Sequence, residues 1–140
     1  MGVILMIEKI IRYGKIGKLP LSLAVRAGDF IFVSGQVPVD ENNQLVKGGI
    51  GIQTEIVFKK IETLLKQAGS SLEDVVTTTV FLTDINDFSA MNKVYQKFFL
   101  KNPPARSCFE VKLAIDASIE VEAIAYYPRT SPIPNSTRQK

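Results

Sequence analysis

The chain has 140 residues, of which 46% are hydrophobic, 22% charged and 9% aromatic, and its net charge is +3. These values are those of a single globular domain with one core. Histidine is absent and Cys108 is the one cysteine, which excludes a Ser-His-Asp triad, a histidine metal cluster and an internal disulfide. A chain without disulfides is compatible with a reducing cytoplasm, where we expect the protein.

The first nine residues are apolar as far as Glu8, which is far short of the roughly 20 residues that a membrane span needs. They also lack the basic start and the cleavage site of a signal peptide, so we expect them to begin an edge strand. The isoelectric point is about 9.0, but no dense basic stretch is interleaved with aromatic residues. A mildly basic surface is therefore favoured over nucleic-acid binding, and we expect no membrane partner.

The next segments change from strand to helix patterns and back. Residues 29–34 are a short apolar run bounded by glycines, which is typical of a buried strand. From about Ile52 to Ala68 the apolar residues recur at helical spacing, and Gly69 is suited to end that helix in a left-handed cap. Residues 75–82 are nearly all β-branched or aromatic, which predicts a central strand.

A second helix is predicted from about Asp87 to Lys101. Asp84 or Asn86 can cap its start, and the two prolines that follow forbid its continuation. Two more strands are predicted at about 105–111 and about 119–127.

This order of elements predicts an α+β domain over residues 1–127, with two helices on one face of a mixed sheet. Residues 128–140 are expected to form a polar tail. A chain this short has no third layer to cover the other sheet face. The polar side chains expected there are Arg106, Cys108, Glu120 and Glu122. An uncovered, half-apolar sheet face implies a partner, so we expect an oligomer that closes its sheets together.

Arg106 is the most informative residue of the chain. It lies in a strand entered through Pro103 and Pro104, and alternation puts it on the same face as Cys108 and Glu110. A guanidinium fixed among apolar neighbours is costly unless an anion meets it. That anion is either a carboxylate of the protein or the carboxylate of a ligand.

Glu120 and Glu122 are two residues apart on a predicted strand, so their carboxylates share one face. One interpretation is a row of side chains that faces solvent. The other is that one carboxylate lies near Arg106 in a dry cleft, where a raised pKa allows it to accept a proton from water. Without histidine, a carboxylate is the best general base that this chain offers.

Three more side chains are candidates for lining a pocket. Cys108 is either a buried, inert thiol or a pocket wall whose pKa is lowered by the guanidinium. Asn92 lies on the apolar side of its helix, where its amide either holds a backbone loop or contacts substrate. Ser34 ends a buried strand and can face the cleft, and Gly35 after it suggests a bulge or a close backbone approach.

Taken together, several segments resemble the Rid family, the YjgF-type imine deaminases. The matching segments are Ala24–Pro38, Thr78–Phe88, Asn92–Tyr95, Pro104–Ser107 and Ile119–Ala125. The resemblance implies that the mixed sheet is six-stranded. It also implies a chorismate-mutase-like homotrimer whose sheets form a central barrel, with three clefts between subunits. It also implies hydrolysis of reactive enamines and imines, such as 2-aminoacrylate and 2-aminocrotonate, to 2-keto acids and ammonia, without a cofactor or a metal.

By the same resemblance, Arg106 holds the carboxylate of the substrate and Glu120 positions or activates water. The other pocket residues that it implies are Ser34, Asn92, Cys108 and the residue at position 21. The family commonly has Pro-Tyr-Ser-Gln-Ala where this chain has Pro20–Ala24, so Leu21 replaces a tyrosine that would bound the pocket. Leu21 suggests a more apolar cleft that takes a larger side chain.

Two other functions stay open at this point. A non-catalytic regulatory trimer that binds small carboxylates is motivated by Leu21. An endoribonuclease or translation inhibitor directed at RNA is motivated by the basic isoelectric point, because some relatives of the family are described in those terms.

Overall fold

In the computed structural model, residues 10–128 are described. Their strands are β1 (Ile10–Tyr13), β2 (Ala24–Ala27), β3 (Phe30–Gln36), β4 (Val75–Leu82), β5 (Ala105–Glu110) and β6 (Ile119–Tyr126). Their helices are α1 (Ile50–Gln67) and α2 (Phe88–Phe98), with two short 3₁₀ turns at Leu72–Asp74 and Ile85–Asp87. The predicted first strand within residues 1–9 and the predicted tail beyond Pro128 lie outside the described residues.

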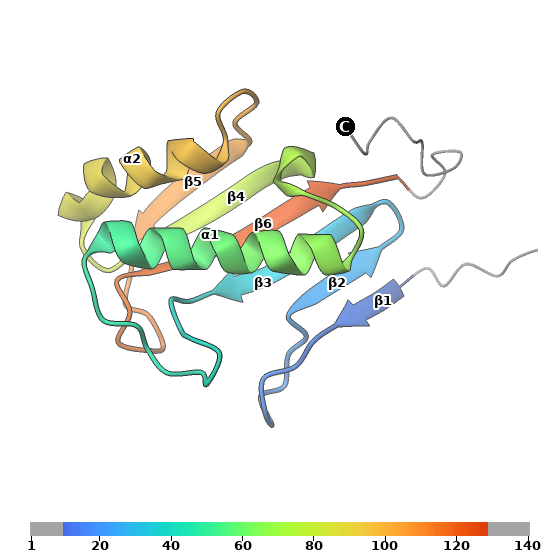
Figure 1. The fold of residues 1–140 in the computed structure, drawn as a ribbon, viewed down its shortest axis with the longest axis horizontal. Coiled ribbons are helices and arrows are strands. Elements are labelled where there is room, and N and C mark those ends of the chain that lie inside the picture. Colours follow the sequence, from blue (N-terminus) through green and yellow to red (C-terminus); the bar gives the residue numbers. More distant parts are fainter. Residues whose placement is uncertain (1–9, 129–140) are drawn as a thin grey trace, which may run out of the picture.

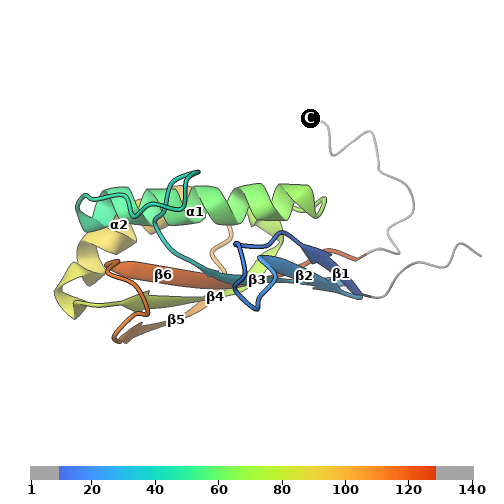
Figure 2. The same cartoon turned by 90° about the horizontal axis from the view of Figure 1, so that it is seen from below.

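The strands form one six-stranded sheet in the order β1-β2-β3-β6-β4-β5 (Figure 1). Neighbouring strands are antiparallel except β4 and β5, which run parallel because α2 connects them. Figure 2 shows both helices on one face of the sheet. The predicted α+β class, with a mixed six-stranded sheet and two helices on one face, is therefore confirmed.

Helix α1 packs its apolar stripe on the sheet and ends as the sequence predicts. Val57, Phe58, Ile61 and Leu65 are fully buried on that stripe. Gly69 follows with φ +84°, and its N–H donates to the carbonyl of Lys66 at 3.0 Å, which is the expected left-handed stop. No helix within residues 10–128 is long and apolar enough to cross a membrane.

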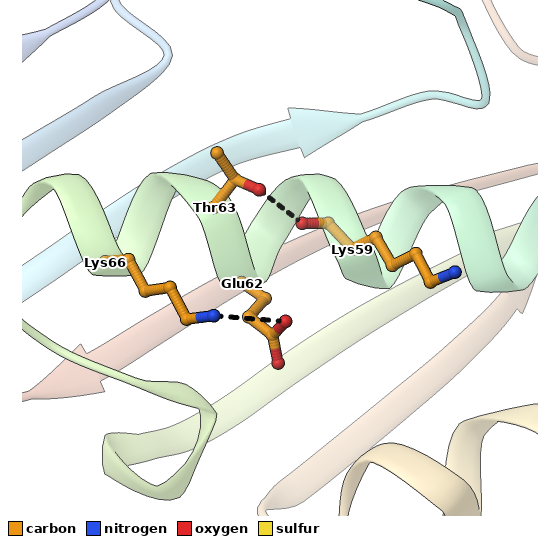
Figure 3. A network of polar contacts seen from close by, with 4 residues as sticks. All are labelled: Lys59, Glu62, Thr63 and Lys66. Carbon is orange, nitrogen blue, oxygen red and sulfur yellow. Dashed lines mark hydrogen bonds and ion pairs between the residues drawn. The ribbon is translucent and has the colours of Figure 1, made fainter.

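The outward side of α1 is polar (Figure 3). Glu62 and Lys66 form an ion pair at 3.6 Å, and the Thr63 hydroxyl donates to the Lys59 carbonyl at 3.0 Å. An exposed ion pair between residues four apart on a helix contributes only about 0.3–0.5 kcal/mol to stability. The position of α1 is thus set by its buried stripe and not by its surface charges.

Helix α2 is shorter than the sequence predicts. It ends at Phe98 and not near Lys101, because Phe99 leaves the helical conformation and buries its ring against Phe58 and Tyr95, at centroid distances of 5.7 and 5.0 Å. At the other end, the Asp84 carboxylate accepts from a backbone N–H within the 3₁₀ turn that precedes α2. The predicted cap therefore acts on that turn.

The opposite face of the sheet is left uncovered by the described part of the chain (Figure 2). Four aromatic side chains on this face are 42% to 52% exposed, namely Phe30, Phe32, Phe109 and Tyr126. Three of them form ring pairs, Phe30 with Tyr126 at 5.3 Å and Phe109 with Phe81 at 6.3 Å. The prediction of a half-apolar, uncovered face is confirmed.

Candidate functional site

The pairing of β5 with β4 decides which face Arg106 takes. Arg106 and Cys108 pair with Thr78 and Val80, which are 1% and 0% exposed beneath the helices. Because paired residues share a sheet face, Arg106 and Cys108 face α2. The prediction that they lie on the uncovered face is wrong, since alternation within a strand gives relative orientations but not the register with its neighbour.

Glu120 lies on the other face. It pairs with the half-exposed Phe81 of β4, and Glu122 shares its orientation, while Val121 between them is fully buried under the helices. Both glutamates are on the uncovered face, as predicted. The expectation that Glu120 meets Arg106 is not met within one chain, because the sheet lies between the two side chains.

Arg106 is held on several sides by α2. Its Nη1 donates to Oδ1 of Asn92 at 2.7 Å, and its Cζ lies 4.7 Å from the centroid of the Tyr95 ring and 5.4 Å from that of Phe88. No carboxylate within residues 10–128 forms an ion pair with it. We call these four residues, together with Cys108, the guanidinium half-site. It presents a half-buried positive charge that is fixed in place and not neutralised by the described chain.

The structure resolves two of the alternatives at this half-site. The Asn92 side-chain oxygen accepts the hydrogen bond from Arg106, so it holds the guanidinium and not a backbone loop. Burial raises the pKa of the Cys108 thiol, and the nearby guanidinium opposes this only in part. Of the two interpretations of Cys108, the one that required a lowered pKa is therefore not supported. A neutral, half-buried thiol is suited to form a pocket wall and not to act as a nucleophile.

The polar residues at the end of β3 lie beside Glu120. A β-carbon added to Gly35 would lie 2.6 Å from Oε1 of Glu120, which confirms the predicted close approach at this glycine. The Ser34 hydroxyl donates to the carbonyl of Ser22 at 2.6 Å. We call Ser34, Gly35 and Glu120 the carboxylate half-site.

Leu21 lies in the loop between β1 and β2 and is 41% exposed. It lines a shallow hollow of about 440 Å³ formed by residues 15–22 of this loop. The bond between Ser22 and Ser34 ties the loop to the carboxylate half-site. A second hollow of about 250 Å³ opens on the uncovered face, where Ser34, Thr77 and Glu122 are among its lining residues.

Phe88 and Tyr95 are site residues that the sequence assigned only to the apolar stripe of α2. Their spacing with Asn92 places all three on one side of the helix, so a polar residue within an aromatic stripe was the available signal. A hydrogen bond of 2.8 Å joins the hydroxyl groups of Tyr95 and Thr78, and it fixes the ring beneath Arg106. Within the described residues, no group of three or more Cys, Asp or Glu side chains is arranged to hold a metal ion.

Glu120 has the electrostatic character of a base. Burial raises the pKa of its carboxyl group, and the like charge of Glu122 raises it further. A carboxylate with a raised pKa holds a proton more strongly once it has accepted one, which suits a general base at neutral pH.

Replacing Glu122 with glutamine is expected to lower the pKa of Glu120 while leaving it above the ordinary value. The substitution removes the repulsion between the two carboxylates but keeps the burial, which is the larger cause. Titration of the labelled Glu120 side chain by ¹³C NMR measures the shift. Glu55→Gln on the exposed side of α1 is the control and should leave the titration of Glu120 unchanged. An unchanged pKa in Glu122→Gln would mean that the two carboxylates do not interact.

Comparison with known proteins finds many relatives of this chain. Residues 17–127 match the model of the endoribonuclease L-PSP family, a range that includes every residue of both half-sites. A RutC family protein of Pyrococcus abyssi is 50% identical over 109 residues, which are 76% of this chain and 86% of that protein.

Solved structures agree with this match. The crystal structure of yeast Mmf1 superposes with a TM-score of 0.81 and 34% identity, over 84% of this chain and 98% of that one. The structure of Escherichia coli TdcF with bound serine has a TM-score of 0.74 and 35% identity, over 82% of this chain and 92% of that one.

Proposed function

Since this chain belongs to the endoribonuclease L-PSP family, which is also the YjgF, RutC or Rid family, we propose that it hydrolyses reactive 2-imino acids and their enamine tautomers to 2-keto acids and ammonia. The observation that carries the proposal is the state of Arg106. Its guanidinium is half-buried, held by Asn92 and two aromatic rings, and has no carboxylate partner within residues 10–128. A ligand carboxylate would supply the missing negative charge.

The substrate is a small carboxylate with an electrophilic carbon next to it. A guanidinium binds a carboxylate through two parallel N–H···O bonds, which fixes the orientation as well as the position of the ligand. The serine bound to TdcF has the same carboxylate and a nitrogen on the neighbouring carbon. Leu21 lies in the loop that the Ser22–Ser34 hydrogen bond ties to the carboxylate half-site, and this apolar neighbour favours an apolar substrate side chain larger than a methyl group.

A complete site requires two chains. The guanidinium half-site and the carboxylate half-site lie on opposite faces of one sheet, so a ligand held by Arg106 has no access to Glu120 of the same chain. The uncovered aromatic face is a surface that a second copy can bury. We therefore place each active site between two protomers of a homotrimer, with one half-site from each.

The reaction proceeds by addition of water to the protonated imine carbon. Glu120 accepts a proton as the water oxygen bonds to carbon, and the electrons of the C=N bond move to nitrogen to give a carbinolamine. The protonated Glu120 then returns the proton to the amine. The C–N bond breaks and ammonia leaves, while the hydroxyl proton passes to the ionised Glu120 as the keto group forms. Glu120 then releases that proton to solvent. Positioning of one water against one carbon is the main task, and such orientation contributes up to about 7–11 kcal/mol in favourable cases.

The test of this function is an assay with freshly generated 2-iminobutanoate. Purified protein should accelerate the appearance of 2-ketobutyrate above the spontaneous rate. The protein should also bind the product 2-ketobutyrate, as measured by calorimetry, in the concentration range in which it turns over 2-iminobutanoate. Ligand binding without any acceleration would instead support the non-catalytic carboxylate-binding trimer.

Mixing two impaired variants tests the shared site. Arg106→Ala should be inactive alone and Glu120→Gln should keep at most about one hundredth of wild-type activity. Unfolding and refolding the two together in equal amounts should restore about one quarter of wild-type activity. In the mixture, half of the protomers carry an intact Arg106 and the other half an intact Glu120. Because protomers associate at random, about one interface in four joins an intact Arg106 to an intact Glu120. No restoration, with mixed trimers verified by mass spectrometry, would place both residues of a site in one chain.

A second candidate activity is cleavage of RNA, which the description of the matching family favours. If the basic surface binds RNA only through phosphate contacts, binding should weaken steeply with salt and survive Arg106→Ala. Cleavage that persists at moderate salt and is abolished by Arg106→Ala would make RNA a genuine substrate of this site.

A further inference from the structure

We propose that Gly35 is a positioning residue for Glu120, whose carboxylate occupies the space that any side chain at position 35 would fill. This inference rests on the proposed function, in which Glu120 handles the proton of water. The three atoms nearest to a β-carbon at Gly35 all belong to Glu120, with Oε1 at 2.6 Å, Cδ at 2.9 Å and Cγ at 3.1 Å. Contacts this short do not occur between real side chains, so Gly35 and the present position of Glu120 depend on each other.

Backbone conformation does not explain the glycine. The glycines of positive φ within the described residues are Gly14, Gly17, Gly28, Gly48 and Gly69, and Gly35 is not among them. Position 35 therefore lies outside the left-handed region that favours glycine. The requirement for glycine comes from the space above its Cα, which the Glu120 side chain takes.

The backbone around Gly35 is held in place on both sides. The buried Gln36 donates from Nε2 to the Ser34 carbonyl at 2.9 Å, and the Ser34 hydroxyl donates to Ser22 at 2.6 Å. The strand pairing with β6 is also irregular between Val33 and Gln36, so that Gly35 itself opposes no residue of β6. A new methyl group would thus displace the end of the flexible glutamate side chain before it moved the strand.

The expected consequence is specific to the catalytic step. A displaced Glu120 would no longer lie against the strand, its carboxylate would be more exposed, and the water that it holds would be misplaced. Misplacement of a reacting group by about 1 Å costs up to roughly 100-fold in rate. Substrate affinity depends on Arg106, which lies in the other half-site, and should change little.

The experiment is Gly35→Ala, compared with Gly51→Ala as a matched control. A β-carbon at Gly51 in α1 would meet Val94 at 3.5 Å, an ordinary contact, so the control should behave as wild type. Gly35→Ala should fold and assemble normally, keep its KM within about twofold, and lose about 10- to 100-fold in kcat. In a Glu120→Gln background, the same substitution should cause no further loss, because it acts through Glu120. A full additional loss in that background would overturn the proposal.

A readout without turnover separates this inference from the proposed function. In Gly35→Ala, ¹³C NMR titration of Glu120 should show a pKa lower than in wild type, since the carboxylate is less buried. If the wild type does not hydrolyse imines but the titration shifts, the proposed function fails and the positioning role stands. If neither the titration nor kcat changes, Gly35 does not position Glu120.

Discussion

Replacing Arg106 with lysine is expected to lower kcat/KM for 2-iminobutanoate by about 100-fold or more, while the protein still folds. A guanidinium makes two charge-assisted bonds to a carboxylate and an ammonium makes one, and each such bond contributes about 1.5–3 kcal/mol. Lysine also loses the contact of the guanidinium with the Tyr95 ring and its hydrogen bond to Asn92, which fix the charge. Arg106→Ala should remove detectable hydrolysis.

Steady-state kinetics over a range of substrate concentrations measure this effect, and circular dichroism and sedimentation verify the fold and the assembly. Arg12→Lys and Arg12→Ala are matched controls, because Arg12 is an exposed cation on the edge strand β1. These controls should retain wild-type kinetics. Normal turnover by Arg106→Ala would remove the proposed anchor and, with it, the proposed substrate class.

Replacing Glu120 with glutamine is expected to lower kcat by about 100-fold or more and to leave KM nearly unchanged, because general bases contribute about 10²- to 10⁴-fold. Glutamine has nearly the same size and keeps a hydrogen-bonding oxygen, but it cannot accept the proton of water. Glu62→Gln is the matched control, because it makes the same substitution on the outer side of α1. A raised KM with unchanged kcat would assign Glu120 to binding.

The pH dependence gives a second check on the same residue. The base works in its ionised form, so kcat of the wild type should fall as the pH drops through the pKa of Glu120. Burial and then Glu122 raise that pKa, so the fall should occur above the pH at which an exposed glutamate titrates. Glu120→Gln should lack this acid limb.

The same shift has a consequence for stability. A raised pKa in the folded state means that folding favours the protonated carboxyl group. The stabilising contribution of Glu120 to the free energy of unfolding is fully present below the pKa that its carboxyl group has in the unfolded chain. It is lost as the pH rises through the pKa of Glu120 in the folded state. Near neutral pH, Glu120→Gln should therefore be no less stable than wild type, as expected where a residue is retained for chemistry and not for folding.

Local patterns were sufficient to predict both helices and four of the strands of this fold, but not the short strands β1 and β2. The spacing of apolar residues predicted α1, and the β-branched run of residues 75–82 predicted β4 with its observed bounds. The exposed aromatic face also followed from the sequence, since two helices cannot cover both sides of a sheet. Arg106 stood out because a charged residue on an otherwise apolar strand needs a partner.

Composition and periodicity thus determined the element order, the fold class and the residues that are able to take part in a reaction. The tertiary structure alone decided which of them meet. Period-two alternation fixes orientations within β5 and within β6, but the face that each strand turns to the helices depends on its pairing with β4. That pairing brings Arg106 to Asn92 and Tyr95 and separates it from Glu120, while the pairing of β6 with β3 lays Glu120 over Gly35. These contacts join residues distant in the chain, so no local pattern encodes them.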